Sequence, residues 1–247
     1  MLDYDKEAER YDALRGGEPR AEAAAGAVLR LVPDTARTLL DLGCGTGIVT
    51  RRLAAARPAL RVTGADLTYG MARHAAVRLP GAIVLADSRQ LPFREGAFDA
   101  VTSVWLLHLL SVPEDVRRTV AECARLLRPG GVYVTTVDKG PSHNVGSDID
   151  AVMAARPASP VPDASGLVEA YAAEAGLSPV GETRFIGRGQ GRSPRRAITD
   201  LRRGWFMTLP PGHPLAPGFE ERLAALPDQE RPRPEPEFRL RAFRKAP

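Results

Sequence analysis

The sequence predicts an α/β fold built on a doubly wound, mostly parallel sheet, and three observations support this. Short apolar segments alternate with helix-length segments between residues 38 and 137, which is the pattern of βαβ units. The first apolar segment runs into a glycine-rich turn that feeds a helix. The apolar segment at 98–105 has the character of a strand buried on both faces. Right-handed crossovers between parallel strands are therefore expected.

The elements follow in order from their apolar pattern and their breakers, such as Pro58, Pro129 and Gly176. The expected helices cover residues 19–34, 48–58, 68–79, 113–128 and 165–177, with helical pieces around 198–209 and 219–226. The expected strands cover residues 38–41, 61–66, 82–87, 98–105, 132–137, 179–188 and 238–245. Tyr4 and Tyr11 are two helical turns apart, so an N-terminal helix would carry both rings on one face.

Composition is typical of a globular protein in a reducing compartment. The chain has 247 residues, 44% of them hydrophobic, which fits one α/β domain with additions. Cys44 and Cys123 form no CxxC pair, so neither a disulfide framework nor a metal site is expected. The N-terminus is charged and no apolar run approaches membrane-spanning length, so we expect a cytoplasmic protein without membrane contact.

The glycine-rich turn at 43–47 is the strongest candidate for a ligand site, because glycines let the backbone approach a ligand. A dinucleotide fingerprint needs glycine where Ile48 stands, and a P-loop needs Gly-Lys-Ser/Thr. The turn holds no Lys or Arg and Asp41 stands at its mouth, so it suits a cation. S-adenosyl-L-methionine (SAM) carries an ammonium and a sulfonium. Asp66 and Asp87, at the next two strand ends, could accept from its ribose hydroxyls and adenine amino group.

Five ordered motifs resemble those of class I SAM-dependent methyltransferases, namely LLDLGCGTG, VTGADL, VLADSRQLPF, FDAVTSVWLLHLL and LLRPGGVYVTT. More narrowly, they resemble the small-molecule branch that includes ubiquinone/menaquinone-type and bacterial natural-product methyltransferases. The resemblance covers roughly residues 1 to 140. It implies a Rossmann-like, seven-stranded sheet whose antiparallel last strand, 238–245, inserts beside the fifth. It also implies SAM as cofactor and S-adenosyl-L-homocysteine (SAH) as product.

The resemblance also implies contacts with the methionine end and the ribose of the cofactor. Asp66 would hold the ribose. The contacts at the methionine end would come from Asp41, Gly43, Cys44 and Gly45. For the acids, the alternative role is capping of the helices that follow the strands.

The remaining implied contacts lie around the adenine and the sulfonium. Leu67 would pack on the adenine, and Asp87, with Ser88 nearby, would bind its amino group. Val104 would pass under the sulfonium, and Tyr11 would close over it. For Tyr11, packing in the core is an equally good interpretation.

Candidates for a general base lie after the fourth and fifth expected strands, where ligands bind in open α/β sheets. His108 follows the fourth strand, and Asp138 and His143 follow the fifth. Each has a plain alternative, as a packing histidine at His108 and as a solvated loop residue at the other two. The resemblance does not choose among them, since the family shares no single base.

We expect one domain over 1–247, with an N-terminal lid at 1–20 and a cap or substrate-binding insertion at 189–236. A basic run in and before the cap could steer an anionic substrate or RNA. Its members are Arg184, Arg188, Arg192, Arg195, Arg196, Arg202 and Arg203. Few aromatic residues are interleaved with them, which favours a solvated face over nucleic-acid binding.

The leading functional hypothesis is a SAM-dependent methyltransferase acting on a small molecule, as a monomer or homodimer, in bacterial secondary metabolism. Methyl transfer would be an in-line displacement, for which alignment and exclusion of water supply most of the catalysis. Two alternatives stay open. One is an rRNA or tRNA methyltransferase. The other is a SAM-binding fold that has lost transfer and assists a cyclisation or binds a ligand.

Overall fold

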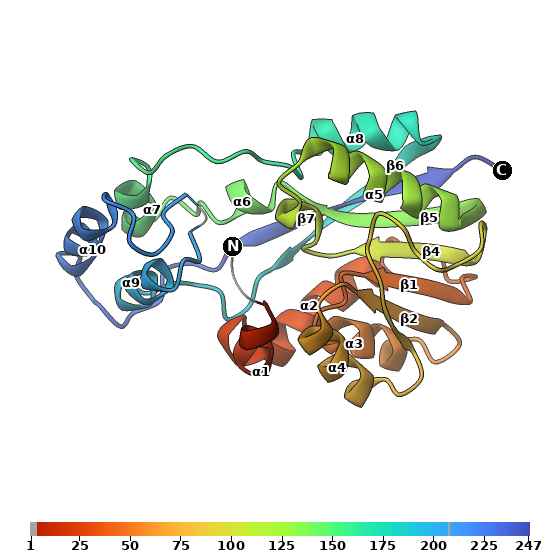
Figure 1. Cartoon of the computed structure of the whole chain (residues 1–247), viewed down its shortest axis with the longest axis horizontal. Helices are drawn as coiled ribbons and strands as arrows, with labels where there is room; N and C mark the ends of the chain where they lie inside the picture. Colours follow the sequence, from red (N-terminus) through yellow and green to blue (C-terminus); the bar gives the residue numbers. More distant parts are fainter. Residues whose placement is uncertain (1–3, 207) are drawn as a thin grey trace.

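The computed structural model describes residues 4–206 and 208–247, so residues 1–3 of the expected lid and Met207 of the expected cap lie outside the described residues. A seven-stranded sheet with the order β3-β2-β1-β4-β5-β7-β6 forms the centre of the molecule (Figure 1). Its strands are β1 (Thr38–Leu42), β2 (Arg61–Asp66), β3 (Ile83–Leu85), β4 (Phe98–Ser103), β5 (Leu127–Val137), β6 (Leu177–Ile186) and β7 (Glu237–Lys245).

The first five strands are parallel, and β7 is antiparallel to both of its neighbours. The insertion of β7 between β5 and β6 confirms the expected seven-stranded sheet with its antiparallel last strand. Leu240 pairs with Thr136 on one side and with Thr183 on the other. Its side chain and those of Phe238, Ala242 and Phe243 are buried, because β7 is an inner strand.

Helices cover both faces of the sheet. On one face, α2 (Gly17–Leu29) and α3 (Ile48–Ala56) pack their apolar sides on the strands through Val28, Leu53 and neighbours. On the other face, α5 (Pro113–Leu126) and α8 (Ser165–Glu174) bury Val120, Val168 and the strand residue Tyr133. α4 (Tyr69–Arg78) lies against β2 and β3. In this three-layer arrangement the helices cover the faces of the sheet but not the carboxyl ends of the parallel strands. We call this uncovered end of the sheet the open edge.

Several of the expected strands begin or end at other residues in the structure. β4 stops at Ser103, because Trp105 takes a left-handed conformation (φ 58°) and its amide donates to Thr136 Oγ1 at 2.9 Å. β5 starts at Leu127, five residues before the expected Val132, so its first residues run through the Pro-Gly-Gly breaker. β3 is only three residues long, at the edge of the sheet.

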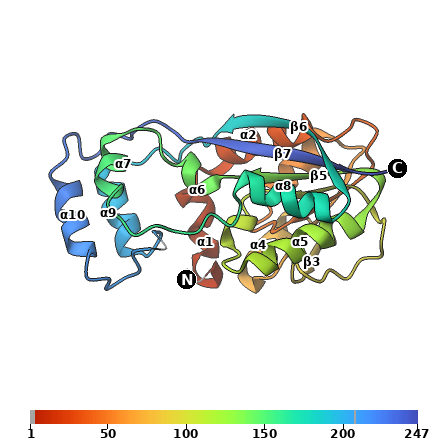
Figure 2. The same ribbon diagram turned by 90° about the horizontal axis from the view of Figure 1, so that it is seen from above.

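A separate group of helices lies beyond the open edge (Figures 1 and 2). α9 (Pro194–Arg202) and α10 (Ala216–Ala224) come from the expected cap, and α7 (Asp148–Met153) joins them from the long connection after β5. They share an apolar core of their own. Its buried members are Ile149, Met153, Ala197, Leu201, Phe206, Leu209, Phe219 and Leu223. We call α7, α9 and α10 with their connections the cap.

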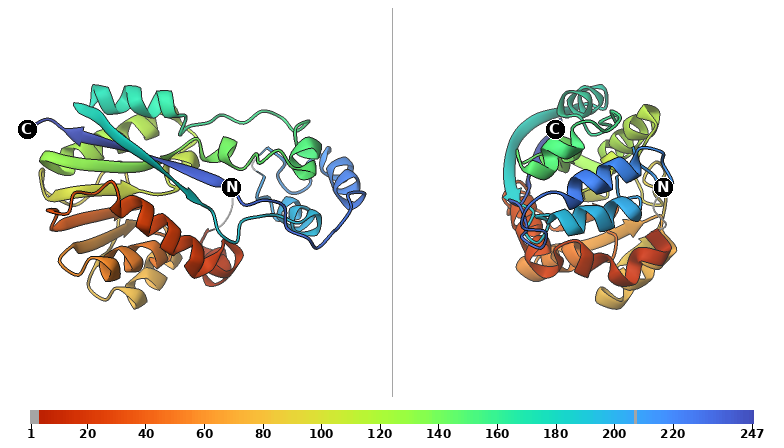
Figure 3. Two further views of the ribbon diagram at one scale, coloured as in Figure 1. Left: turned by 180° about the vertical axis from the view of Figure 1, so that it is seen from behind. Right: turned by 90° about the vertical axis from the view of Figure 1, so that its left-hand side faces the viewer.

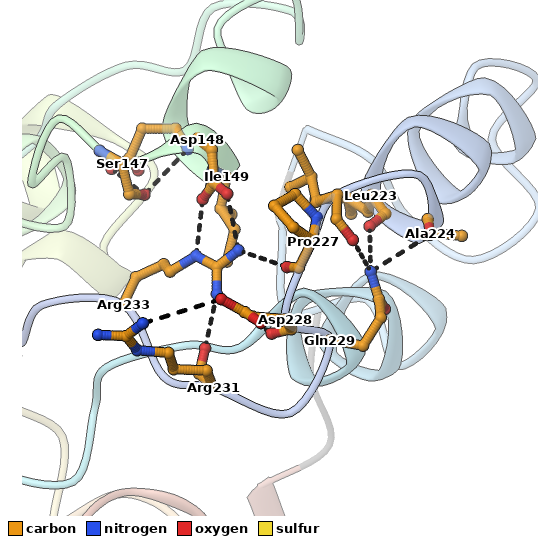
Figure 4. Close-up of polar contacts among 12 residues, drawn as sticks. Ser147, Asp148, Ile149, Leu223, Ala224, Pro227, Asp228, Gln229, Arg231 and Arg233 are labelled. Carbon is orange, nitrogen blue, oxygen red and sulfur yellow. Dashed lines mark hydrogen bonds and ion pairs between the residues drawn. The ribbon is translucent and has the colours of Figure 1, made fainter.

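Arg233, on the segment that returns from the cap to β7, fastens α7 to this group (Figure 4). Its Nε and Nη2 donate to the two carboxylate oxygens of Asp148, each at 2.7 Å. It also donates to the carbonyl oxygens of Pro227, Asp228 and Arg231. The bidentate pair holds two segments that are 85 residues apart in the chain.

α1 (Tyr4–Leu14) lies across the open edge, between the cap and the helices under the sheet (Figures 1 and 3). Its Tyr4 and Tyr11 rings are 6.1 Å apart, as their spacing predicts. Asp5 Oδ1 accepts from the Gly70 amide at the start of α4. Within the described residues, no helix has both the length and the apolar character that crossing a membrane requires.

Candidate active site

The glycine turn between β1 and α3 forms the base of the candidate site. Gly43, Gly45 and Gly47 all have left-handed backbone, with φ of 69°, 56° and 76°. At Gly47 a side chain is also excluded by space, since a Cβ would lie 2.9 Å from Ala75 of α4. The Gly43 and Cys44 amides both donate to the carbonyl oxygen of Ala65 on β2. The turn is therefore held close to the adjacent strand end.

Asp66, at the end of β2, is bonded to this turn. Its Oδ2 accepts from the Gly45 amide and its Oδ1 from the Thr68 amide, each at 2.8 Å. Burial raises the pKa of its carboxyl group above the usual range. The next residue, Leu67, is 65% exposed although it is apolar, so its side chain is available to a flat apolar ligand at this strand end.

Asp41 is buried beneath the turn. Its Oδ2 accepts from Thr50 Oγ1 at 2.6 Å. Burial, with a contribution from the negative charge of Asp66, raises the pKa of Asp41 to about 7. Cys44 is also buried, and its side chain packs against Gly64 of β2. The two acids lack a cation partner among the described residues.

Asp87 and Ser88, after β3, have protein partners. The guanidinium of Arg89 contacts both oxygens of Asp87 and also pairs with Asp115 on α5. The pKa of the Asp87 carboxyl is lowered by this hydrogen-bonded pair. The hydroxyls of Ser88 and Thr119 are 3.2 Å apart. An adenine amino group at Asp87 would have to share its carboxylate with Arg89.

α1 covers the turn through Asp12. One carboxylate oxygen of Asp12 accepts from Thr46 Oγ1 at 2.7 Å, and the other pairs with Arg78 of α4 at 2.6 Å. Tyr11 is half-buried beside Tyr4, whose pKa is raised by burial and by the neighbouring Tyr11. The negative charge of Asp66 also raises the pKa of Tyr4.

The ends of β4 and β5 carry the base candidates. Val104 is buried, and His108 lies in a single turn of 3₁₀-helix (Leu107–Leu109), where its Nδ1 is buried with no partner among the described residues. Burial and the charges of Lys139, Arg20 and Arg15 hold the pKa of His108 well below its usual range. The imidazole is therefore neutral at physiological pH.

Asp138 follows β5 with a left-handed backbone (φ 52°). Its Oδ1 accepts from the Ser165 amide at the start of α8, and its Oδ2 pairs with Arg239 of β7. These bonds keep the pKa of Asp138 below its usual range despite partial burial. A carboxylate with this low pKa and two bonded oxygens fastens β5 to α8 and β7.

His143 lies just past the short helix α6 (Lys139–Ser142), with its ring edge-on to Phe238 at 5.3 Å. Burial and the charges of Lys139, Arg192 and Arg15 hold the pKa of His143 well below its usual range. Its ring also lines a cavity of about 100 Å³ between α1 and α9. His108 also contributes to the lowered pKa of His143.

Known proteins resemble the chain over the same region. A comparison with protein families matches residues 40–135 to the family described as Methyltransferase domain. The match runs from β1 to β5 and includes the glycine turn and Asp66. Residues 40–135 are therefore similar to this family, and we refer to them as the methyltransferase-like domain. The resemblance to class I SAM-dependent methyltransferases that the motifs indicate is thereby confirmed for this region.

Similar proteins extend the likeness beyond the methyltransferase-like domain. Over 178 residues the chain is 31% identical to malonyl-[acyl-carrier protein] O-methyltransferase of Herminiimonas arsenicoxydans, covering 70% of this chain and 64% of that protein. Over 138 residues it is 33% identical to demethylmenaquinone methyltransferase of Thermotoga maritima, covering 53% and 58%. The chain thus spans less than two thirds of these relatives' own length.

A solved structure shows that the likeness extends over the whole fold. The crystal structure of the [4+2]-cyclase SpnF superposes with a TM-score of 0.61, covering 98% of this chain and 93% of that one. Its sequence identity to this chain is 21%, so this likeness shows a shared fold. The methyltransferase-like domain and its additions therefore have the Rossmann-like architecture that the sequence predicts.

The structure places cationic residues near the two histidines that the sequence does not single out. Arg15 and Lys139 contribute to the charge around both histidines, and Arg20 contributes to the charge around His108. Arg20 is buried with its guanidinium 3.6 Å from the ring centre of Trp105. No local pattern marks these residues, because they meet only where α1, β4 and β5 end together.

The basic run divides into outward and inward members. Arg184, Arg195 and Arg202 are exposed, and each pairs with a glutamate. Arg192 and Arg196 instead turn inward and share the buried Asp200. The run is therefore not one continuous basic face.

Proposed function

We propose that this chain is a SAM-dependent methyltransferase that transfers a methyl group to a small molecule, in a pathway of bacterial secondary metabolism. The observation that carries the proposal is the methyltransferase-like domain at 40–135, which holds the acid-lined glycine turn. Because the chain spans only part of its relatives, the activity is inferred from this region and from the site at its open edge. Arg184, Arg195 and Arg202 each pair with a glutamate, which supports a small-molecule acceptor over RNA.

The residues of the turn fit SAM. Asp41 and Asp66 are acids with raised pKa values, and among the described residues no cation pairs with them. A ligand with an ammonium group offsets the cost of their burial. Leu67 presents an apolar surface where a flat ring would lie, and Asp66 stands beside the Gly45 amide to receive hydroxyl groups. The bound cofactor would supply an electrophilic methyl group.

The chain's own contribution is alignment and exclusion of water. α1, bonded through Asp12 to the turn and to α4, closes one side of the site, and the cap closes the side beyond β4 and β5. In-line displacement needs little more than this orientation, which supplies on the order of 7–11 kcal/mol. The backbone is left-handed at Trp105, just after β4, and at Asp138, just after β5. These uncommon conformations fix the direction in which the chain leaves the two strands.

Within this proposal, His108 is the proton acceptor. It is neutral, and its Nδ1 has no protein partner among the described residues, so a lone pair is available to an acceptor's proton. His143 contacts the acceptor from the cavity side. Asp138 acts as a positioning residue, because both of its oxygens are bonded to β7 and α8.

Turnover of labelled SAM with a metabolite extract tests the proposal. A methylated small molecule together with SAH is the expected result. Tight SAM binding without any transfer would overturn it in favour of a fold that assists a cyclisation or binds a ligand. Transfer of the label to RNA, with an affinity that falls steeply with salt, would overturn the small-molecule acceptor.

A further inference from the structure

The cavity between α1 and α9 has an unusual charge. Its lining includes Arg15, Arg192 and Arg196 against one carboxylate, that of Asp200, with His143 and Gln190 completing the polar wall. Asp200 is buried and uses one oxygen for Arg192 Nε at 3.2 Å and the other for Arg196 Nε at 3.0 Å. Three guanidinium groups therefore share one negative charge.

Two of these guanidinium groups keep unused donors. Arg196 is the exception, because its Nη2 also donates a hydrogen bond to the Leu14 carbonyl oxygen. Arg15 has no carboxylate within ion-pair distance in 4–206 and 208–247, and the terminal nitrogens of Arg192 have no acceptor there. Planar guanidinium forks with free donors match the oxygens of a carboxylate or a phosphate.

Aromatic rings hold these two side chains in place. The Arg15 guanidinium lies 3.3 Å from the ring centre of Trp205, and that of Arg192 lies 5.0 Å from the ring centre of Phe206. A stacked guanidinium has already lost much of its conformational freedom, so binding an anion costs less entropy than at a solvated arginine. This arrangement differs from the exposed, glutamate-paired arginines of the same run.

Two neighbouring groups also lack partners. Gln190 Nε2 is buried without an acceptor among the described residues, which is costly unless a ligand supplies one. The Lys139 ammonium lies close enough that the charges of Arg15, Arg20 and Arg192, added to burial, lower its pKa to about 7. Like charges gathered in a buried region repel one another, and a bound anion relieves that repulsion.

We propose that this cavity binds an anionic group of the acceptor, a carboxylate or a phosphate, through Arg15, Arg192 and Gln190. The volume of about 100 Å³ is large enough for one such group. No residue of the glycine turn lines the cavity, so the anion anchors the acceptor away from the cofactor. That the anion belongs to a methyl acceptor rests on the proposed function.

Calorimetric titration of the full chain with inorganic phosphate and with succinate, at constant ionic strength set with chloride, tests the proposal. We expect at least one of the two probes to bind with a saturable isotherm. Arg15→Gln and Arg192→Gln should each weaken that binding at least tenfold. Arg15→Lys should restore part of it. Arg202→Gln, an exposed arginine paired with Glu220 in the same cap, is the matched control and should leave it unchanged.

The outcomes separate the inference from the proposed function when SAH is titrated in parallel. The anion site is overturned if phosphate and succinate give no more binding heat than a chloride titration does. It is also overturned if Arg202→Gln weakens binding of the probe as much as Arg15→Gln does. SAH binding that persists in Arg15→Gln and Arg192→Gln shows that these variants are folded. Anion binding without any SAH binding would support the cavity and count against the methyltransferase.

Discussion

At the scale of single residues, the buried carboxyl of Asp41 links cofactor binding to protons. Its pKa is raised to about 7 by burial and by Asp66, and a ligand ammonium beside it would favour the ionised form. Binding then releases a proton, so affinity rises with pH until the carboxyl is ionised in the free protein. We expect SAH to bind about tenfold more tightly at pH 8 than at pH 6. Calorimetry at the two pH values measures this, and equal affinities would refute the link.

The raised pKa also means that ionised Asp41 lowers the free energy of unfolding. The pKa in the folded chain lies above that of an unfolded aspartate, so the contribution of this group to stability is greatest at acid pH. It falls as the pH rises from about 4 to about 7. Asp41→Asn should therefore make the ligand-free protein more stable at pH 8, by about 1–4 kcal/mol, while it weakens SAH binding. Urea unfolding that shows a loss of stability at pH 8 would be inconsistent with this account.

Asp66 tests the position of the ribose. Replacement by alanine removes two charge-assisted bonds to the ligand, and SAM affinity should fall at least tenfold, or about 1.4 kcal/mol. Asp66 also accepts from Gly45 and Thr68, so Asp66→Ala disturbs the turn as well. Asp66→Asn keeps one acceptor for these amides and serves as the comparison. Unchanged affinity in the alanine variant by calorimetry would remove the ribose from this strand end.

The proposed role of His108 as proton acceptor can be tested directly. His108→Ala should lower kcat with little change in SAM affinity, because the proposal assigns its unpartnered Nδ1 to the proton of the methyl acceptor. His213→Ala is a suitable control, since His213 lies between α9 and α10 and its ring Nδ1 accepts from the nearby Leu215 amide. Steady-state rates with the acceptor found by labelled turnover give the comparison. Full activity in His108→Ala would exclude it as the base.

At the scale of elements, local patterns were sufficient for the methyltransferase-like domain. The ends of β1 and β2 and the turn between β1 and α3 are consequences of nearby residues, such as glycines that need a positive φ. The position of β7 came from family resemblance, since a strand's neighbours are set by distant parts of the chain. Trp105 illustrates the limit, because its left-handed backbone is accompanied by a hydrogen bond from its amide to Thr136 Oγ1 in another strand.

The candidate site was less predictable for the same reason. Asp138 follows β5 as expected, but its bonds to Arg239 and to the start of α8 come from 101 and 27 residues away. The membership of α7 in the cap likewise depends on Arg233. Sequence could identify a basic run, but which arginines turn inward is decided by the position of one buried carboxylate, Asp200.

The cap gives a prediction at this scale. Arg233→Gln removes a bidentate pair with Asp148 that is largely shielded from solvent on the arginine side. We expect a loss of about 1–3 kcal/mol confined to the cap. Hydrogen exchange should rise in 148–153 and 216–233 and stay unchanged in the sheet. Arg202→Gln, which removes a solvent-exposed pair with Glu220 in the same cap, is the control and should have little effect. An equal effect in both variants would contradict the assigned role.

At the scale of the whole molecule, α1 joins two sites of opposite charge. On one side its Asp12 binds the turn and α4 above the acids that would hold the cofactor. At its other end, the Leu14 carbonyl oxygen accepts from Arg196 of α9, and Arg15 stacks on Trp205. A ligand that orders α1 at one site therefore also orders the part of α1 that borders the other site. This is the basis for coupling between the two ligands.

We expect SAH to raise the affinity of the full chain for the anionic probe by about three- to tenfold, a coupling of about 0.7–1.4 kcal/mol. Thermodynamic linkage requires the probe to raise SAH affinity by the same factor, so the two titrations check each other. Asp12→Ala frees α1 from Thr46 and Arg78 while leaving Arg15 in place, and it should reduce the coupling more than it reduces binding of the anion alone. Equal probe affinity with and without SAH, in a protein that binds both, would show that α1 covers two independent sites.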